Sequence, residues 1–91
     1  PEAASIALGA AARIRLARGD VAGAEGLWKT IVTDHATSPE APEAELEWAR
    51  ALLRRGDRAG AVERFEHLIL TYPRSALVPL ARRELEAARA G

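Results

Sequence analysis

The side chains best suited to metal or acid–base chemistry in this 91-residue chain are its two histidines, His35 and His67. Glu63 lies one helical turn before His67, so the two side chains could offer two ligands to a metal ion. A zinc site needs a third protein ligand, and the His-Glu-x-x-His pattern of metalloproteases is absent. His35 stands at the end of an apolar stripe, where a partly packed spacer is expected. We therefore expect neither a metal site nor a cofactor.

The serines and aspartates that could act as nucleophiles or bases recur in register along the chain. Asp20 and Asp57 occupy equivalent positions of an internal repeat, as do Ser38 and Ser75. Recurrence of this kind is typical of helix caps, whereas a catalytic group occurs once. We interpret these residues, together with Ser5, as caps. There is no Gly-rich phosphate loop and no Cys nucleophile, so the sequence predicts a protein that is not an enzyme.

Trp28 and Trp48 could stack against a base or a sugar, but both match apolar repeat positions. Trp28 lies on an apolar helical stripe, and Trp48 stands where Leu85 stands one repeat later. Both are therefore predicted to be core residues.

The composition describes one small globular unit and excludes several function classes. The chain is 48% hydrophobic and 29% charged, and thirteen Lys and Arg balance thirteen Asp and Glu. Zero net charge argues against a dedicated binder of nucleic acid or membrane surfaces. No apolar run approaches the ~20 residues that span a bilayer. Because the chain begins with Pro1 and contains no Met, we expect it to be a piece of a longer protein.

An internal repeat of 37 residues is the main signal in the sequence. The segment 16–20, Leu-Ala-Arg-Gly-Asp, returns as Leu-Arg-Arg-Gly-Asp at 53–57. One register without gaps also aligns identical or similar residues: Ala12 with Ala49, Arg13 with Arg50, Ala24 with Ala61, Trp28 with Phe65, Ile31 with Leu68, and Ala44 with Ala81. Such self-similarity is the signature of a repeat architecture.

Each repeat is predicted to form two helices. The stripe Ala61, Phe65, Leu68, Ile69 and Tyr72 follows helical spacing, as does its counterpart in the first repeat. Asp caps begin the second helices, and Gly56 ends a first helix. We predict an all-α fold with helices at about 3–18, 21–35, 39–55, 58–72 and 76–90. The repeats are placed at 3–37 and 38–74, and 75–90 is a terminal capping helix, within one domain spanning 1–91.

These residues resemble the tetratricopeptide repeat (TPR). The pattern Ala49, Leu52, Gly56-Asp57, Ala61, Phe65, Leu68-Ile69 and Pro73 carries the likeness, and the first repeat carries it again with Ala36 in place of proline. The usual unit has ~34 residues, so each unit here has a few more. The resemblance implies a right-handed α-solenoid.

The residues between the repeats are similar to those of bacterial envelope proteins. Tyr72-Pro73-Arg74-Ser75 and the following Pro79 form a Tyr-Pro-x-Ser-x-x-x-Pro junction. Such junctions occur in Tol-Pal coordinator proteins of the YbgF/CpoB type and in BamD-like outer-membrane assembly lipoproteins. This resemblance implies a periplasmic or cell-envelope location, with the cytoplasm as the alternative.

The TPR resemblance also implies a concave groove lined by the first helices. Its expected lining has an apolar floor flanked by guanidinium groups, and the candidate peptide-binding residues are Arg13, Glu43, Leu46, Arg50, Leu53, Arg54, Leu80 and Arg83. Such a groove suits a peptide with apolar and acidic side chains, because Arg contacts carboxylates in a bidentate manner. The alternative is a solvated helical face on which Glu43 and Glu47 lie beside Arg50.

Two functions remain open from the sequence. The first is a non-catalytic interaction module that docks a partner peptide or helix in the groove. The second is a self-association or spacer domain of a larger protein. Neither implies a nucleic-acid partner or insertion into a membrane.

Overall fold

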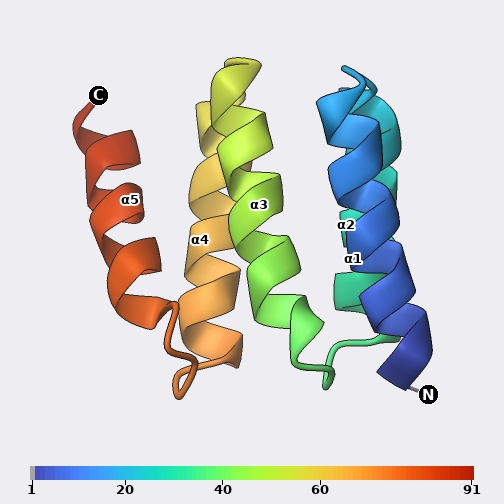
Figure 1. Ribbon diagram of the computed structural model, residues 1–91. Helices are drawn as coiled ribbons and strands as arrows, with labels where there is room; N and C mark the ends of the chain where they lie inside the picture. The colour runs from blue at the N-terminus through green and yellow to red at the C-terminus, as the bar shows by residue number, and fades with distance from the viewer. Residues whose placement is uncertain (1) are drawn as a thin grey trace. The chain divides into compact units, whose positions relative to one another are not determined.

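The protein is a chain of five α-helices in the computed structural model, which describes residues 2–91 (Figure 1). The helices are α1 (Glu2–Ala17), α2 (Val21–Asp34), α3 (Glu40–Arg54), α4 (Arg58–Thr71) and α5 (Val78–Ala90). No strand occurs among the described residues. The predicted all-α class with five helices is therefore confirmed, and each predicted helix boundary lies within two residues of the observed one.

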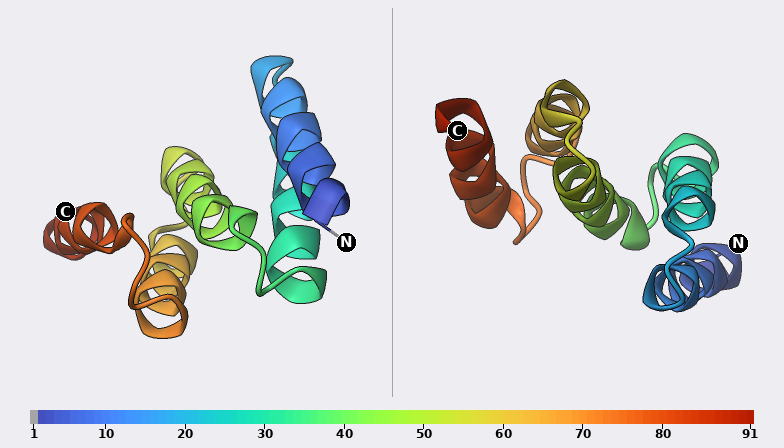
Figure 2. Two further views of the ribbon diagram at one scale, coloured as in Figure 1. Left: turned by 60° about the horizontal axis from the view of Figure 1, so that its bottom comes forward. Right: turned by 90° about the horizontal axis from the view of Figure 1, so that it is seen from above.

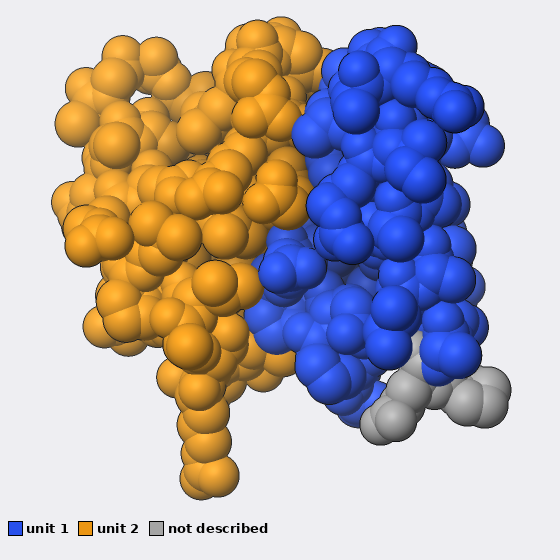
Figure 3. Space-filling model, viewed as in Figure 1, with its two compact units in different colours: residues 1–44 blue, residues 45–91 orange. Residues whose placement is uncertain are grey.

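The chain divides into two compact units, residues 1–44 and residues 45–91 (Figure 3). Unit 1 contains α1, α2 and the first residues of α3. Unit 2 contains the rest of α3 together with α4 and α5. The boundary between the two units falls inside α3, after Ala44.

The turns that join α1 to α2 and α3 to α4 have the same construction. Gly19 and Gly56 have φ angles of 83° and 86°, in the left-handed region where glycine ends a helix without steric cost. The carboxylates of Asp20 and Asp57 then accept hydrogen bonds from the backbone N–H groups of Gly23 and Gly60, both at 2.9 Å. Both aspartates are therefore N-caps, as predicted.

The recurrence of glycine after each cap has a steric reason. A Cβ atom at Gly60 would lie 2.5 Å from Oδ2 of Asp57, and one at Gly23 would clash with Asp20 in the same way. The glycine leaves room for the capping carboxylate to fold over the first turn.

The prediction that serines cap the helices is wrong for Ser5 and Ser38. Ser5 lies inside α1, is 1% exposed, and donates a 2.7 Å hydrogen bond to Oε1 of Glu40. The hydroxyl of Ser38 is buried and has no hydrogen-bond partner among the described residues. Ser75 accepts a hydrogen bond from the N–H of Leu77 at 3.1 Å, so it holds the turn before α5 without capping the helix itself.

Small residues lie at the centre of each helical pair. Ala12, Ala24, Ala49 and Ala61 are all fully buried. The aromatic residues one turn further along the second helices, Trp28 and Phe65, are buried as well. The predicted core role of Trp28 is confirmed.

The core of unit 2 combines side chains from three helices. The helix α4 contributes Ala61, Phe65 and Leu68 to one cluster with residues of α3 and α5. Figure 2 shows α4 displaced to one side of the line that joins α3 and α5, so that α3 and α5 share the opposite side. This arrangement positions the candidate groove residues of unit 2.

Candidate interaction surfaces

The best-defined polar contact in unit 2 joins Arg50 of α3 to Glu84 of α5. Nε and Nη2 of Arg50 donate to the two carboxylate oxygens of Glu84 at 2.9 and 2.6 Å. Nη1 of Arg50 also donates to Oε2 of Glu47 at 3.4 Å. The hydrogen bonds with Glu84 raise the pKa of Arg50, and they lower the pKa of Glu84. Arg50, one of the predicted groove residues, therefore links α3 to α5.

The expected apolar floor of the groove needs one correction. Leu46 is only 3% exposed and belongs to the core cluster, because it lies three residues before Ala49 on the same side of α3. Leu53 and Leu80 pack against this cluster but remain half-buried. These two leucines, without Leu46, supply the accessible apolar surface.

Helical spacing from Arg50 and Glu84 places a partly apolar surface beside the pair, and we name it the α3–α5 face. It consists of Leu53, Arg54, Leu80, Arg83 and Ala87. Arg54, Arg83 and Ala87 are exposed. A hollow at one end of this face is lined by Leu53, Arg58, Glu84, Ala87, Ala88 and Gly91. The face therefore combines apolar side chains with exposed guanidinium groups.

The two predicted groove residues of unit 1 form a weak ion pair. Nη1 of Arg13 lies 4.0 Å from Oε1 of Glu43, and the side chains are 68% and 61% exposed. Exposed pairs at this distance contribute little to stability, because water screens the charges. Both groups therefore remain accessible to solvent.

A buried carboxylate, Glu45, is the polar feature that the sequence interpretation missed. Its side chain has no exposed surface. Nη1 of Arg64 donates to Oε1 at 3.1 Å, and Nδ1 of His67 contacts Oε2. Burial raises the pKa of the Glu45 carboxyl, and the charges of Arg64 and His67 oppose this effect. Burial raises the pKa of Tyr72, and the nearby Glu45 carboxylate adds to this effect.

The Glu45 cluster is a paired polar network inside unit 2. Its acceptor oxygens are both occupied, and His67 pairs with Glu45 instead of Glu63. No group of three potential metal ligands occurs in the described part of the chain. One signal could have revealed the cluster: Glu45 lies four residues after Ala41 and four before Ala49, on an apolar stripe of α3.

Trp48 packs against the core, as predicted, but also has a polar neighbour. The guanidinium carbon of Arg64 lies 4.8 Å from the centre of the indole ring, which is cation–π geometry. The ring is only partly buried, and its Nε1 atom has no hydrogen-bond partner among residues 2–91. Trp48 thus covers the side of the Glu45 cluster.

Comparisons with family models, with curated proteins and with solved structures gave no match for this chain. No helix within residues 2–91 is both long and apolar enough to cross a membrane.

Proposed function

We propose that this protein is a non-catalytic interaction module of the TPR type, which docks a partner peptide or helix on the α3–α5 face. One observation carries the proposal: half-buried Leu53 and Leu80 lie with exposed Arg54 and Arg83 on two helices that the Arg50–Glu84 pair holds together. Leucines accept apolar side chains, and arginines accept carboxylates in a bidentate manner. The expected ligand is a segment with alternating apolar and acidic residues.

The Arg50–Glu84 pair supports this role through preorganisation. Two hydrogen bonds between a planar guanidinium and a carboxylate fix both the spacing and the angle of the two side chains. A surface whose helices are already fixed loses less conformational entropy when a ligand binds. The pair therefore acts as a brace between α3 and α5. Arg54 and Arg83 are the arginines that bind the carboxylates of the ligand.

The 37-residue repeat and the matching turns support the TPR assignment within this proposal. The Tyr72-Pro73-Arg74-Ser75 junction supports a setting in a larger bacterial envelope protein. The proposed setting is the periplasm, where such a module would take part in envelope assembly or division.

A display library of acidic and apolar peptides tests the proposal directly. The wild-type protein should select peptides that combine Leu with Asp or Glu. The double variant Arg54→Glu/Arg83→Glu should weaken the selected peptides by at least about tenfold, since each reversed charge removes an attraction and adds a repulsion.

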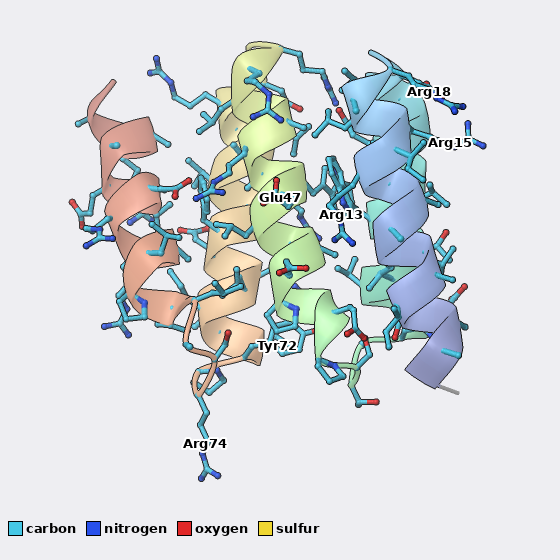
Figure 4. All side chains as sticks on the ribbon, in the orientation of Figure 1. Arg13, Arg15, Arg18, Glu47, Tyr72 and Arg74 are labelled. Atoms are coloured by element: carbon cyan, nitrogen blue, oxygen red, sulfur yellow. The ribbon has the colours of Figure 1, made fainter. Side chains whose placement is uncertain are left out.

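The matched control is Arg74→Glu, because Arg74 lies in the loop between α4 and α5 and extends away from the helices (Figure 4). It changes the charge of the same unit without touching the α3–α5 face. Equal binding by the wild type and both variants, with unchanged circular dichroism, would contradict the proposed use of this face.

A second candidate function is self-association or spacing within a larger protein. It is favoured by the exposure of two large apolar residues on α1, Ile6 at 57% and Ile14 at 53%. Light scattering of the purified chain over a hundredfold concentration range tests for self-association. A constant monomer mass would contradict it.

A further inference from the structure

The helix α1 carries apolar residues on two sides, although only one side packs within unit 1. Ser5 and Ala12 are buried on the side that pairs with α2. A second side, which we name the outer face of α1, consists of Ala4, Ala7, Ala11 and Ile14. Ala7 and Ile14 are exposed, and Ala4 and Ala11 are half-buried. A helix with a single buried side would normally be polar on the other.

Unit 2 shows what covers the equivalent positions in another helix of the chain. Two repeat lengths after the outer face of α1, the same four positions of α5 are occupied by Val78, Ala81, Leu85 and Ala88. All four are buried, and they share one core cluster with Ala61, Phe65 and Leu68 of α4. In α5, this set of positions is the contact surface for the second helix of the preceding repeat.

The charged neighbours of the two faces are equivalent as well. Arg89 of α5 contacts the carboxylate of Glu66 on α4. The equivalent residue of α1 is Arg15, which lies beside the outer face and pairs with Asp20 of its own unit at 2.9 Å. Figure 4 shows Arg15 and Arg18 at the same end of α1. A helix covering α1 would thus meet guanidinium groups where α4 places Glu66.

A hollow in unit 1 opens beside the outer face of α1. It is lined by Ala11, Ile14, Arg15, Arg18 and Asp20. Ala11 stands at the position that Trp48 and Leu85 fill in the later first helices. Because Ala11 leaves this space open, a bulky side chain can enter from the partner.

We propose that the outer face of α1 docks the second helix of another helical hairpin of this repeat type. The occupant carries a stripe like that of α4, with a small residue, an aromatic residue and an aliphatic residue at the spacing of Ala61, Phe65 and Leu68. It also carries an acidic residue at the position of Glu66, which binds Arg15. The helix α2 has Lys29 at that position, so the chemistry matches α4 and not α2. The proposal does not depend on the function of the α3–α5 face.

The experiment adds such a helix to the intact chain. A copy of residues 38–74 is fused directly before Pro1, which preserves the 37-residue register and supplies an α4 helix in cis. The expected result is one cooperative unfolding transition with a melting temperature at least about 5 °C above that of the parent chain, since each added repeat contributes an interface.

Two substitutions test whether the gain in melting temperature comes from contact with the outer face of α1. In the parent chain, Ile14→Asp should shift the melting temperature by no more than about 2 °C, because the side chain is 53% exposed. In the fused chain, the same change should abolish most of the gain. Glu66→Lys in the added copy should remove part of it, and the loss should diminish at high salt. Leu70→Asp, at a site 79% exposed on α4, is the matched control and should act equally in both chains.

Three outcomes would overturn the proposal. The added repeat could unfold in a separate transition, or Ile14→Asp could have the same effect in both chains. In addition, light scattering could reveal a dimer of the parent chain that Ile14→Asp dissociates. Because the α4 stripe of each copy is already buried in its own unit, a different surface of the second copy would then be the occupant.

Discussion

The helices α1 and α5 occupy the same place in the repeat, yet their unpartnered sides differ in chemistry. On α1, the side without a partner in its unit carries Ala7 and Ile14, both exposed. On α5, the positions equivalent to the α2-facing side of α1 are all exposed, namely Pro79, Arg82, Glu86 and Ala90. One helix therefore leaves apolar surface in contact with water, and the other leaves charged surface there.

This difference shows that equivalent helices of a repeat can present either a polar or an apolar surface on the side that has no partner. The polar side of α5 is suited to water, as in the terminal helices of repeat proteins. Exposure of the apolar side of α1 has an unfavourable free energy in water, which burial would remove. The local turns and caps of the two hairpins are the same, so the contrast lies in side chains alone.

The contrast between the two helices is tested most strongly by placing the same charge at equivalent positions of α1 and α5. Ala81→Asp should lower the free energy of unfolding by about 3 kcal/mol or more, because Ala81 is fully buried and the carboxylate would have no partner. Ala7→Asp should change it by no more than about 0.5 kcal/mol, because that position of α1 is exposed. Urea unfolding followed by circular dichroism measures both values.

Equal destabilisation by the two substitutions would contradict the comparison. It would mean that the outer face of α1 is covered in solution, and light scattering of the wild type would then be required. Ala7→Ser and Ala81→Ser are controls of similar size without charge.

The helices could be predicted from the sequence because the signals that determine them are local. Asp57 and Gly60 fix the start of α4, and Gly56 fixes the end of α3, all within a few residues. The spacing of Phe65 and Leu68 then indicates which side of α4 is buried.

The candidate site was less predictable because its contacts join distant residues. Glu84, the partner of Arg50, lies 34 residues away, and only the packing of α3 beside α5 brings the two together. Leu46 was expected in the groove because the TPR resemblance implies it, but it stands one turn before Ala49, and the core determines its direction. Glu45 was missed because an apolar stripe does not itself predict an Arg partner from another helix.

The Arg50–Glu84 pair offers a smaller test of the same comparison, because α1 has Ala10 where α5 has Glu84. A double-mutant cycle with Arg50→Ala and Glu84→Ala should give a coupling free energy of about 1 kcal/mol. The side chains are 33% and 25% exposed, which limits the value. The control cycle pairs Arg50→Ala with Glu86→Ala and should show no coupling. A zero coupling for Arg50 and Glu84 would remove the brace from the proposed docking face.

The aspartate N-caps are the feature that the two hairpins share, and their contribution to stability can be measured. Asp57→Ala should cost about 1 kcal/mol of unfolding free energy, since the N–H of Gly60 loses its 2.9 Å hydrogen bond. Asp57→Asn should retain most of the stability, because the amide oxygen can accept the same bond. If Asp57→Ala were as stable as the wild type in urea, the cap would be a geometric feature without an energetic role.

The smallest effect is a dependence on pH that only the α5 side should show. The hydrogen bonds from Arg50 lower the pKa of Glu84 below the ordinary value of about 4.5, so between these two pKa values the unfolded chain binds more protons than the folded chain. This contribution is complete above about pH 4.5 and is lost as the pH falls through the folded pKa.

Glu84→Gln removes the titrating group, so the difference in stability between wild type and variant should shrink by a few tenths of a kcal/mol between pH 5 and pH 3. Burial of Glu45 acts with the opposite sign, because its raised pKa makes folding take up protons, but it is present in both proteins and cancels in the difference. Urea unfolding at half-unit pH steps measures the effect. A constant difference across this range would mean that Glu84 titrates as an unpaired carboxylate, and the bidentate pair that separates α5 from α1 would then be absent in solution.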